Sequence, residues 1–285
     1  MTTDPSIGPL PPARLPPRPA DCHKGDFGTV GILGGAPGMA GAALLAGRAA
    51  LACGAGRVCV GLLDERLAVD PLAPELMLTG PGRVLELPRP ACLVAGPGLG
   101  RSSAARAWLA AALALDHALL LDADALNLLA GDGELLDRLR GRGRPTLLTP
   151  HPGEAARLLG MDTAQVQADR QAALARLVDL GRAVVILKGA GTLVGAPGSP
   201  AWQNATGNPG MAAPGMGDVL TGLVAGLLVQ GMFPLDAARA GVWLHGAAGD
   251  AALASGIGPV GMAAGEIIPW ARQLANSSLV DGPSN

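Results

Sequence analysis

The chain has 285 residues, of which 49% are apolar, and its 21 basic and 23 acidic side chains give a net charge of −2. This length fits one large domain or two small ones, and the apolar content excludes an intrinsically disordered protein. The balanced charge, the absence of tyrosine and the presence of only two phenylalanines argue against a nucleic-acid partner.

The beginning of the chain differs in composition from the rest. Residues 1–20 hold seven prolines and no long apolar run, so they are predicted to be a stiff leader with little structure, and not a signal peptide. Residues 21–285 are predicted to form one domain, because no linker or composition break divides them. The four cysteines form no C-x-x-C pair and are interpreted as reduced thiols of a cytoplasmic protein.

Apolar runs and helical patterns alternate along this domain. Helices are predicted over about 41–53 and 103–115, and two or three more follow Asp218. One more helix is predicted to start with the capping-box pair Asp162 and Gln165. Gly181 is predicted to be the left-handed residue at its end. Strands are predicted over residues 29–34, 57–63, 91–95, 118–121, 146–149 and 183–187. Apolar strands separated by helices predict a three-layer α/β fold, in which a mainly parallel sheet has helices on both faces.

A strongly apolar stretch runs from Val219 to Leu235 and contains the small-residue pair Gly222 and Gly226. It is shorter than a membrane span and includes a proline. We therefore predict a buried helix that packs closely on the rest of the fold, and no membrane partner.

Glycines and polar residues are concentrated where the predicted strands end. Parallel sheets bind ligands beyond the carboxyl ends of their strands, so these loops predict one rim that holds a large ligand or two ligands. None of the loops has the spacing of a P-loop, a dinucleotide fingerprint or a serine nucleophile elbow. The five loops are residues 34–41, 96–100, 122–124, 149–154 and 188–192.

The strongest single signal is the segment 204–218 (NATGNPGMAAPGMGD), which ends at Asp218 and opens an apolar helix. Free N–H groups at a helix start form an anion-binding site. An aspartate beside that site can take the proton of a hydroxyl that attacks a phosphoryl group. The alternative is that Asp218 merely caps the helix. Three glycines among the eight residues before Asp218 favour the catalytic interpretation.

Taken together, these segments resemble the ADP/ATP-dependent NAD(P)H-hydrate dehydratases, also called the YjeF C-terminal domain, a branch of the ribokinase-like superfamily. The resemblance implies a ribokinase-like fold and repair of the S-epimer of hydrated NADH or NADPH, with phosphate and AMP (from ADP) or ADP (from ATP) as products. It covers about residues 21–270, and its matching segments are 23–28 (HKGDFG), 34–42, 96–100, 121–128 (LDADALNL), 149–154, 188–192 and 204–218.

The resemblance also implies roles for individual residues. Asp218 corresponds to the catalytic aspartate, which also contacts the hydrated dinucleotide, and Glu154 to a glutamate near Mg²⁺. Pro214 stands where the family commonly has glycine, and it removes one N–H group from the anion-binding turn. The substrate contacts implied are Ala42, Gly98, Gly100 and His151, and the nucleotide contacts are Lys188, Gly189, Ala190, Gly191, Thr192 and Gly217.

Several side chains keep two interpretations. Asp122 and Asp124 either contact a ligand or cap a helix. For His23 and Lys24, which precede the first predicted strand, contact with the substrate and no such contact are both open. His245 is interpreted as a packed histidine. Three loop methionines are candidates to contact a flat ligand ring: Met39, Met211 and Met216.

Two other functions stay open beside the dehydratase. One is a small-molecule kinase of the same fold, of the hydroxyethylthiazole or hydroxymethylpyrimidine kinase type. The other is a non-catalytic nucleotide sensor. The resemblance further implies Mg²⁺, ADP or ATP as co-substrate, a homo-oligomer (tetramer) and a separate NAD(P)H-hydrate epimerase as pathway partner.

Overall fold

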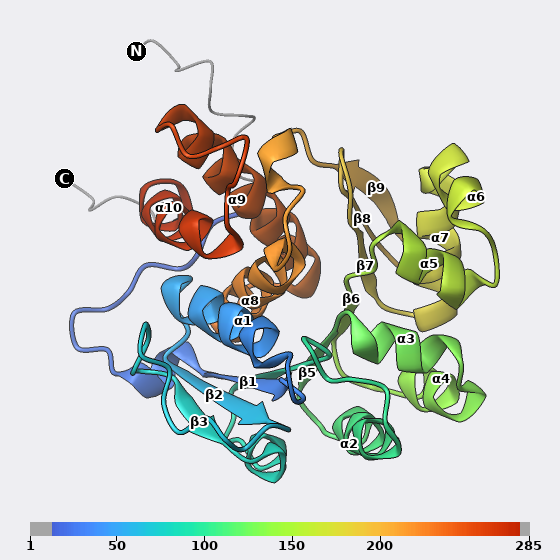
Figure 1. Ribbon diagram of the computed structural model, residues 1–285, viewed down its shortest axis with the longest axis horizontal. Helices are drawn as coiled ribbons and strands as arrows, with labels where there is room; N and C mark the ends of the chain where they lie inside the picture. Colours follow the sequence, from blue (N-terminus) through green and yellow to red (C-terminus); the bar gives the residue numbers. More distant parts are fainter. Residues whose placement is uncertain (1–12, 280–285) are drawn as a thin grey trace.

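The computed structural model describes residues 13–279. At its centre is one nine-stranded sheet with the order β3-β2-β1-β4-β5-β6-β7-β8-β9 (Figure 1). Neighbouring strands are parallel from β3 to β7, whereas β8 and β9 are antiparallel additions at one edge. The strands are β1 Thr29–Gly34, β2 Arg57–Leu62, β3 Met77–Thr79, β4 Ala91–Ala95, β5 Ala118–Leu121, β6 Thr146–Leu148, β7 Val184–Leu187, β8 Leu193–Ala196 and β9 Ser199–Gln203.

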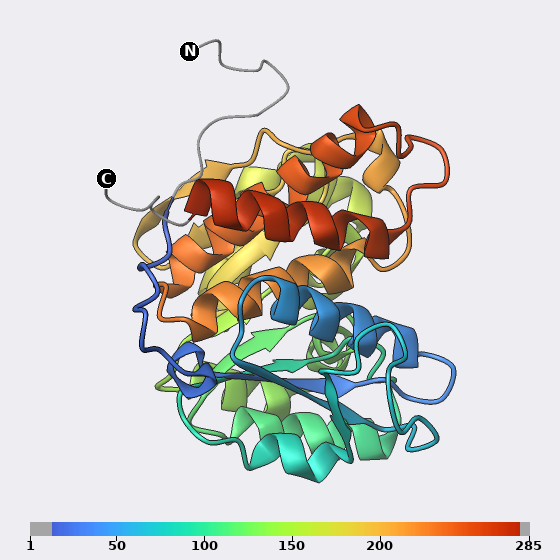
Figure 2. The same cartoon turned by 90° about the vertical axis from the view of Figure 1, so that its left-hand side faces the viewer.

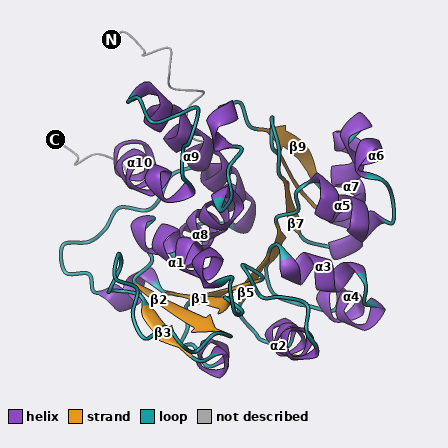
Figure 3. Cartoon of the chain, viewed as in Figure 1, coloured by secondary structure: helices purple, strands orange, loops and turns teal. Residues whose placement is uncertain are grey.

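Helices cover both faces of the sheet (Figures 1 and 3). In the view of Figure 2 the two helical layers lie on opposite sides of the strands. One layer consists of α1 Ala40–Ala52, α8 Met216–Val229, α9 Pro234–Ala254 and α10 Ile267–Leu274. The other consists of α2 Ser103–Leu113, α3 Asp124–Ala130, α4 Gly133–Arg140, α5 Pro152–Leu159, α6 Thr163–Ala168 and α7 Arg170–Gly181.

Alternation along single strands explains why both faces are covered. In β4, Cys92 and Val94 belong to one buried apolar cluster, while Leu93 and Ala95 belong to the cluster on the other side of the sheet. Successive side chains of a strand point to opposite faces, so an all-apolar strand needs cover on both. The predicted three-layer α/β fold is confirmed, and so are all six predicted strands.

The sequence patterns did not predict β3, β8 and β9. β3 is only three residues long and partly exposed, and β9 is an edge strand that contains Pro200 and buries little. Such strands lack the continuous apolar run that identifies a central strand.

The apolar stretch that begins at Val219 forms most of α8, which packs against α1. A Cβ added at Gly222 would lie 2.1 Å from the backbone oxygen of Ala46, and one at Gly226 would lie 2.8 Å from that of Ala50. The two glycines therefore let the helix backbones approach closely, which confirms the predicted buried helix. Within residues 13–279, no helix has the length and apolarity that crossing a membrane requires.

The single helix predicted between Asp162 and Gly181 is wrong in two details. The chain breaks at Asp169, whose carboxylate accepts a hydrogen bond from the N–H of Ala172 and so caps α7 separately from α6. The left-handed residue at the end is Arg182, with φ 49°, and not Gly181. Gly181 is instead needed for close packing, because an added Cβ would lie 2.9 Å from Leu148 Cδ1. The capping box of Asp162 and Gln165 is confirmed.

Part of the proline-rich segment contacts the domain. The N–H of Leu15 donates to the carbonyl of Leu279 at 2.7 Å, and Leu15 is buried among the core residues. Arg18 donates to the carbonyl of Gly54 and lies over the ring of Phe27. The remainder of the predicted leader, residues 1–12, lies outside the described residues, and the boundary at residue 20 stays a prediction.

Candidate active site

The sheet order brings the predicted loops to one edge. The strands β1, β4, β5, β6 and β7 are neighbours in the sheet and parallel, so their carboxyl ends lie side by side. The chain runs outward from β1 through β2 to β3 and then returns to β4 on the other side of β1. Such a reversal opens a crevice beyond the strand ends, where ligands of α/β proteins bind.

The loops after β1 and β4 meet at this reversal. The N–H of Gly35 donates to the carbonyl of Pro97 at 3.0 Å, and the N–H of Ala36 donates to that of Gly98 at 2.6 Å. Gly98 has φ 60°, and an added Cβ would lie 2.5 Å from the Met39 oxygen. Only glycine fits there. This contact places Gly98 next to the start of α1, where Ala42 is the third residue.

Gly100 is held by Asp124, the first residue of α3. Its N–H donates to Asp124 Oδ2 at 2.9 Å, and Arg101 Nε lies 3.5 Å from Asp124 Oδ1. The side chain of Met39 lies beside Gly100 and is partly exposed. The predicted substrate contacts Ala42, Gly98 and Gly100 are thus brought to one side of the rim.

A charged cluster occupies the middle of the rim. Lys188, directly after β7, donates from Nζ to Asp122 Oδ1 at 2.7 Å and lies 3.9 Å from Glu154 Oε2. The other oxygen of Asp122 accepts a hydrogen bond from Thr221 Oγ1 at 2.8 Å. Asp122, Glu154 and Thr221 are all buried. A Cβ added at Gly217 would lie 3.1 Å from Lys188 Nζ, so the ammonium group contacts the first turn of α8.

Asp218 is the third residue of α8 and follows a left-handed turn. Gly215, with φ 87°, is the N-cap residue, and the cap makes no side-chain hydrogen bond. Asp218 therefore does not occupy the capping position, and the capping alternative is wrong. The first-turn N–H groups belong to Met216, Gly217 and Asp218, which precede any helical partner. Pro214 lies before the N-cap, so its missing N–H does not affect that turn.

Several ionisable groups of this cluster have pKa values that differ from their usual values. Burial, followed by the charge of Asp122, raises the pKa of Asp218 to about 7. Burial likewise raises the pKa of Glu154 to about 7, against the opposing effect of Lys188. Burial disfavours the Lys188 ammonium, but the charges of Asp122 and Glu154 outweigh it and raise the pKa of that group. Lys188 therefore stays charged at neutral pH, while two carboxyl groups titrate there.

His151 and Glu154 form the start of α5. The N–H of Gly153 donates to His151 Nδ1 at 3.0 Å, and the N–H of His151 donates to Glu154 Oε2 at 2.8 Å. His151 Nε2 lies 3.3 Å from Glu154 Oε1. Burial, and then the charge of Lys188, lowers the pKa of His151. The ring is therefore neutral at pH 7 and half-exposed at the rim.

The loop from Lys188 to Thr192 is partly exposed at the rim. Gly189 and Gly191 have φ 134° and 61°, and Gly189 and Ala190 are exposed. Thr192 Oγ1 donates to the carbonyl of Gly189 at 2.8 Å, which closes the turn. All five residues of the predicted nucleotide segment thus lie together at the end of β7, next to α8.

Comparisons with known proteins establish the family of the chain. The family model described as NAD(P)H-hydrate dehydratase matches residues 30–269. The chain belongs to the NAD(P)H-hydrate dehydratase family. It is 45% identical to the ADP-dependent (S)-NAD(P)H-hydrate dehydratase of Neisseria meningitidis serogroup B, over 91% of this chain and 88% of that protein. It is also 42% identical to the bifunctional NAD(P)H-hydrate repair enzyme Nnr of Escherichia coli, covering 94% of this chain but 51% of that enzyme.

Solved structures show the same fold. The ADP/ATP-dependent NAD(P)H-hydrate dehydratase of Bacillus subtilis, co-crystallised with ATP and Mg²⁺, matches with a TM-score of 0.79 and 30% identity, over 92% of this chain and 95% of that one. Hydroxyethylthiazole kinase of Pyrococcus horikoshii matches with a TM-score of 0.59, over 86% of this chain and 87% of that one, but at 16% identity this similarity shows the fold alone. The match to the dehydratase family favours the predicted enzyme class over the kinase alternative.

In this member of the NAD(P)H-hydrate dehydratase family, several residues that the sequence analysis singled out do not present their side chains at the rim. His23 and Lys24 precede β1 and therefore lie at the amino end of the strands, opposite the rim. Met216 is buried, and Met211 packs against Gly249. His245 is packed as predicted, and burial lowers its pKa to about 4. Neither Asp122 nor Asp124 caps a helix.

Sequence patterns missed two residues that shape the site. Thr221 lies one helical turn after Asp218, so its position on the same face of α8 was the available signal. Arg170, at the start of α7, donates to the carbonyls of Leu187 and Lys188 and so supports the end of β7. Nothing in the local sequence connects α7 to that strand end.

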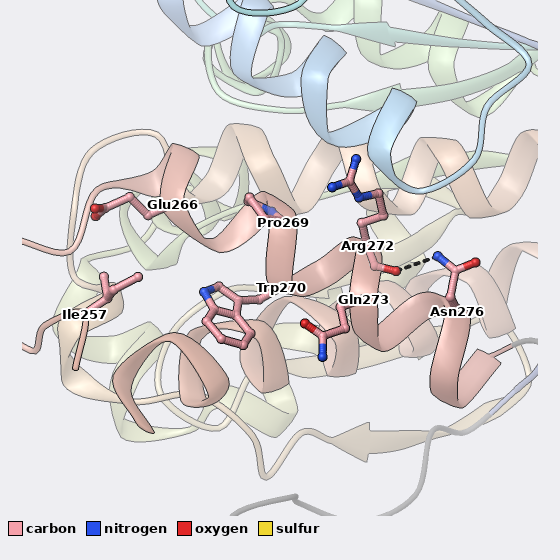
Figure 4. Close-up of a pocket in the computed structure, with 7 residues that line it drawn as sticks. All are labelled: Ile257, Glu266, Pro269, Trp270, Arg272, Gln273 and Asn276. Carbon is pink, nitrogen blue, oxygen red and sulfur yellow. Dashed lines mark hydrogen bonds between the residues drawn. The ribbon is translucent and has the colours of Figure 1, made fainter. Parts of the chain in front are cut away.

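A separate hollow of about 560 Å³ lies on α10. Figure 4 shows Trp270 in its middle and the hydrogen bond from Asn276 to the carbonyl of Arg272. It contains none of the predicted site residues, and the charged rim remains the candidate active site. The lining residues are Ile257, Glu266, Pro269, Trp270, Arg272, Gln273 and Asn276.

Proposed function

We propose that this protein restores NADH and NADPH from the S-epimers of their hydrates, with ADP or ATP as phosphoryl donor. The proposal rests on how Asp218 and Lys188 are arranged at the start of α8. Asp218 lies in the first turn of α8, and the Lys188 ammonium lies against Gly217 in the same turn. A base, a cation and free N–H groups therefore meet at one point. Phosphoryl transfer to a hydroxyl needs a base for the proton of the hydroxyl, and positive groups for the negative charge of the phosphoryl group.

The chemistry explains why a nucleotide is consumed. Hydroxide is a poor leaving group, since the pKa of water is about 15.7. Phosphate, with a second pKa of about 6, leaves far more readily. In the proposed first step, the hydroxyl oxygen of the hydrate bonds to the terminal phosphorus while its proton passes to Asp218. The bond from that phosphorus to the nucleotide oxygen breaks, which releases AMP from ADP or ADP from ATP.

In the second step the carbon–oxygen bond breaks and phosphate leaves with the bonding electrons. The lone pair of the ring nitrogen assists this departure, and loss of a proton from the adjacent carbon restores the ring double bond. The Lys188 ammonium and the α8 N–H groups stabilise the negative charge of the phosphoryl group throughout.

The two ligands are proposed to approach from opposite sides of Asp218. The hydrate would contact Ala42, Gly98, Gly100 and His151, and the nucleotide would contact Lys188, Gly189, Ala190, Gly191, Thr192 and Gly217. In-line transfer supports this division, because the attacking oxygen and the leaving oxygen lie on opposite faces of the transferred group.

The residues at the rim fit a Mg²⁺ ion carried by phosphates. Three buried or half-buried carboxyl groups, those of Asp122, Glu154 and Asp218, lie around a single ammonium group, that of Lys188. Within residues 13–279, no cluster of three or more acidic, histidine or cysteine side chains forms a cage for a metal. Mg²⁺ commonly uses one or two carboxylates together with substrate phosphates, so Glu154 is the proposed protein ligand. When bound, the ion would neutralise phosphate charge.

We further propose that the protein is a cytoplasmic homo-oligomer, with a tetramer as the expected form, and that a separate epimerase supplies the S-epimer. The free thiols of the four cysteines support a reducing compartment. The chain spans about half the length of the bifunctional E. coli relative, at 51%. Light scattering of the purified protein would measure the oligomeric state.

One assay tests the proposed function. The purified protein is incubated with hydrated NADH, Mg²⁺ and either ADP or ATP, and both the absorbance of reduced nicotinamide and free phosphate are followed. Equal amounts of regenerated NADH and phosphate are expected. A stable phosphorylated product without NADH would indicate a kinase, and nucleotide binding without turnover would indicate a sensor.

A further inference from the structure

Asp122 joins three elements through one carboxylate. It directly follows β5 and is 1% exposed. Its two oxygens have different partners, Lys188 Nζ at 2.7 Å and Thr221 Oγ1 at 2.8 Å. Lys188 follows β7 and Thr221 belongs to α8. A charge-assisted hydrogen bond of this kind holds both partners in a fixed geometry.

The backbone next to Asp122 is unusual. Ala123 has φ 49° and ψ −114°, a conformation that residues with a side chain rarely adopt. Because of this turn, the aspartates on either side of Ala123 have different partners. Asp122 accepts a hydrogen bond from Lys188, and Asp124 accepts one from the N–H of Gly100. Strained backbone of this kind persists where the surrounding contacts require it, and it is concentrated at ligand sites.

Lys188 needs a fixed partner to act at a defined place. Its ammonium group ends a flexible four-carbon chain with rotatable donors, unlike the rigid guanidinium of arginine. Glu154 lies at 3.9 Å, too far for a hydrogen bond. The Asp122 carboxylate is therefore the hydrogen-bonding partner that holds Lys188 Nζ against Gly217.

We infer that Asp122 is a positioning residue, which acts on the transferred phosphoryl group only through the Lys188 ammonium that it holds at the first turn of α8. The inference rests on the proposed function for its catalytic meaning. Asp122 is 1% exposed and both of its oxygens accept hydrogen bonds from protein groups, so it is not placed to take the proton of the substrate. That task remains with Asp218.

A double-mutant cycle of Asp122→Asn and Lys188→Met tests this inference, since residues that act through one another are not additive. Asp122→Asn should lower kcat on the order of tenfold to a hundredfold, the scale of one hydrogen bond to a charged group. Its KM for hydrated NADH should hardly change. Lys188→Met should lower kcat at least as much, and the double variant should be no slower than Lys188→Met alone.

The same cycle is measured by calorimetric titration with ADP and Mg²⁺, which needs no turnover. Each single variant should weaken ADP binding, and the double variant should bind no more weakly than Lys188→Met. Failure of the wild type to turn over hydrated NADH would contradict the proposed function, whereas this titration would still test the link between Asp122 and Lys188.

Asp70→Asn is the matched control, because Asp70 is also fully buried and accepts two hydrogen bonds from Arg48, at 2.6 Å each, outside the charged cluster. It should lower the melting temperature but leave kcat and ADP affinity unchanged. If Asp122→Asn does not fold, Asp122→Glu replaces it in the cycle. The glutamate keeps the negative charge but displaces it, so a smaller loss of kcat is expected. Additive losses of the Asp122 and Lys188 variants, in both kcat and ADP affinity, would overturn the inference.

Discussion

Asp218 illustrates how burial prepares a single side chain for proton transfer. A solvent-exposed aspartate is a weak base because its pKa is about 3.9. Burial and the charge of Asp122 raise the pKa of Asp218 to about 7. A base whose pKa lies near the working pH combines useful basicity with a large deprotonated fraction.

Asp218→Asn is expected to lower kcat by at least about a hundredfold, because the amide keeps the shape of the carboxylate but cannot accept a proton. The free energy of unfolding and the affinity for ADP should change little. Steady-state kinetics and an ADP titration check this expectation. Turnover close to that of the wild type would remove Asp218 from the role of base.

The pH dependence of kcat/KM should follow the ionisation of the cluster. Below about pH 7 Asp218 becomes protonated and inactive as a base, so kcat/KM should fall about tenfold per pH unit on the acid side. Glu154 titrates in the same range, and the observed value belongs to the coupled pair. A profile from pH 5 to 9 in buffers of constant ionic strength provides the measurement. An acid limb with its midpoint near pH 4 would contradict the raised pKa.

At the scale of elements, the contact of α1 with α8 sets the position of Asp218. α8 carries Asp218 in its first turn, and Gly222 brings its backbone against Ala46 of α1. A change in this contact therefore moves the base relative to the strand ends. Because the Lys188–Asp122 pair is anchored on the sheet, the two sides of the site would lose their alignment.

Gly222→Ala should destabilise the protein by about 2–3 kcal/mol, because an added Cβ would lie 2.1 Å from the Ala46 oxygen and the helices must move apart. Gly133→Ala is the matched control, since nothing lies within 4 Å of its added Cβ and it begins the exposed helix α4. That change should stabilise the protein by up to about 1 kcal/mol. Urea denaturation of both variants checks the contrast, and equal stabilities would contradict the packing argument.

The loop after β7 allows a second matched comparison. Gly191 and Gly198 both have left-handed backbones, with φ 61° and 71°, but only Gly191 lies in the proposed nucleotide segment. Gly191→Val should raise the KM for ADP several times more than the KM for hydrated NADH. Gly198→Val, in the β8–β9 turn, should cost stability but leave both KM values unchanged. Kinetics with each substrate varied in turn distinguish the two, and an equal effect on both KM values would remove the loop from nucleotide binding.

On the scale of the whole molecule, strand order decides which loops meet. The reversal between β1 and β4 places the glycine loops of the proposed substrate side next to β5, β6 and β7, which carry the charged residues. The loops of the proposed substrate side and of the proposed nucleotide side thus lie along one edge of the sheet, where Lys188 also lies against Gly217 of α8.

The proposed separation of the hydrate site from the nucleotide site predicts a ternary complex. Intact NADPH, used as a mimic of the hydrate, should bind on the side of Ala42 and His151 without displacing ADP. Calorimetric titration of ADP into protein saturated with NADPH should give an affinity within about threefold of that for the free protein, a difference below 1 kcal/mol. Mutual exclusion of NADPH and ADP would mean one shared pocket and would contradict the two-sided geometry.

The sequence alone determined the features that depend on local patterns. Continuous apolar runs such as residues 91–95 determined the buried parallel strands, and the turn before Asp218 determined a helix start with free N–H groups. The edge strand β9 escaped prediction because it is short and partly polar, and β8 because its apolar run is only four residues long and contains Gly195. The break at Asp169 escaped prediction because a side-chain cap, and not a proline, divides the two helices.

Only the tertiary structure decided how the charges of the site are paired. Lys188 and Thr221 lie 66 and 99 residues from Asp122 in the chain, yet both bind its carboxylate. No local pattern encodes that pairing, because it depends on the order of the strands and on where α8 packs. The raised pKa of Asp218 has the same origin, since burial and neighbouring charges exist only once distant segments have come together.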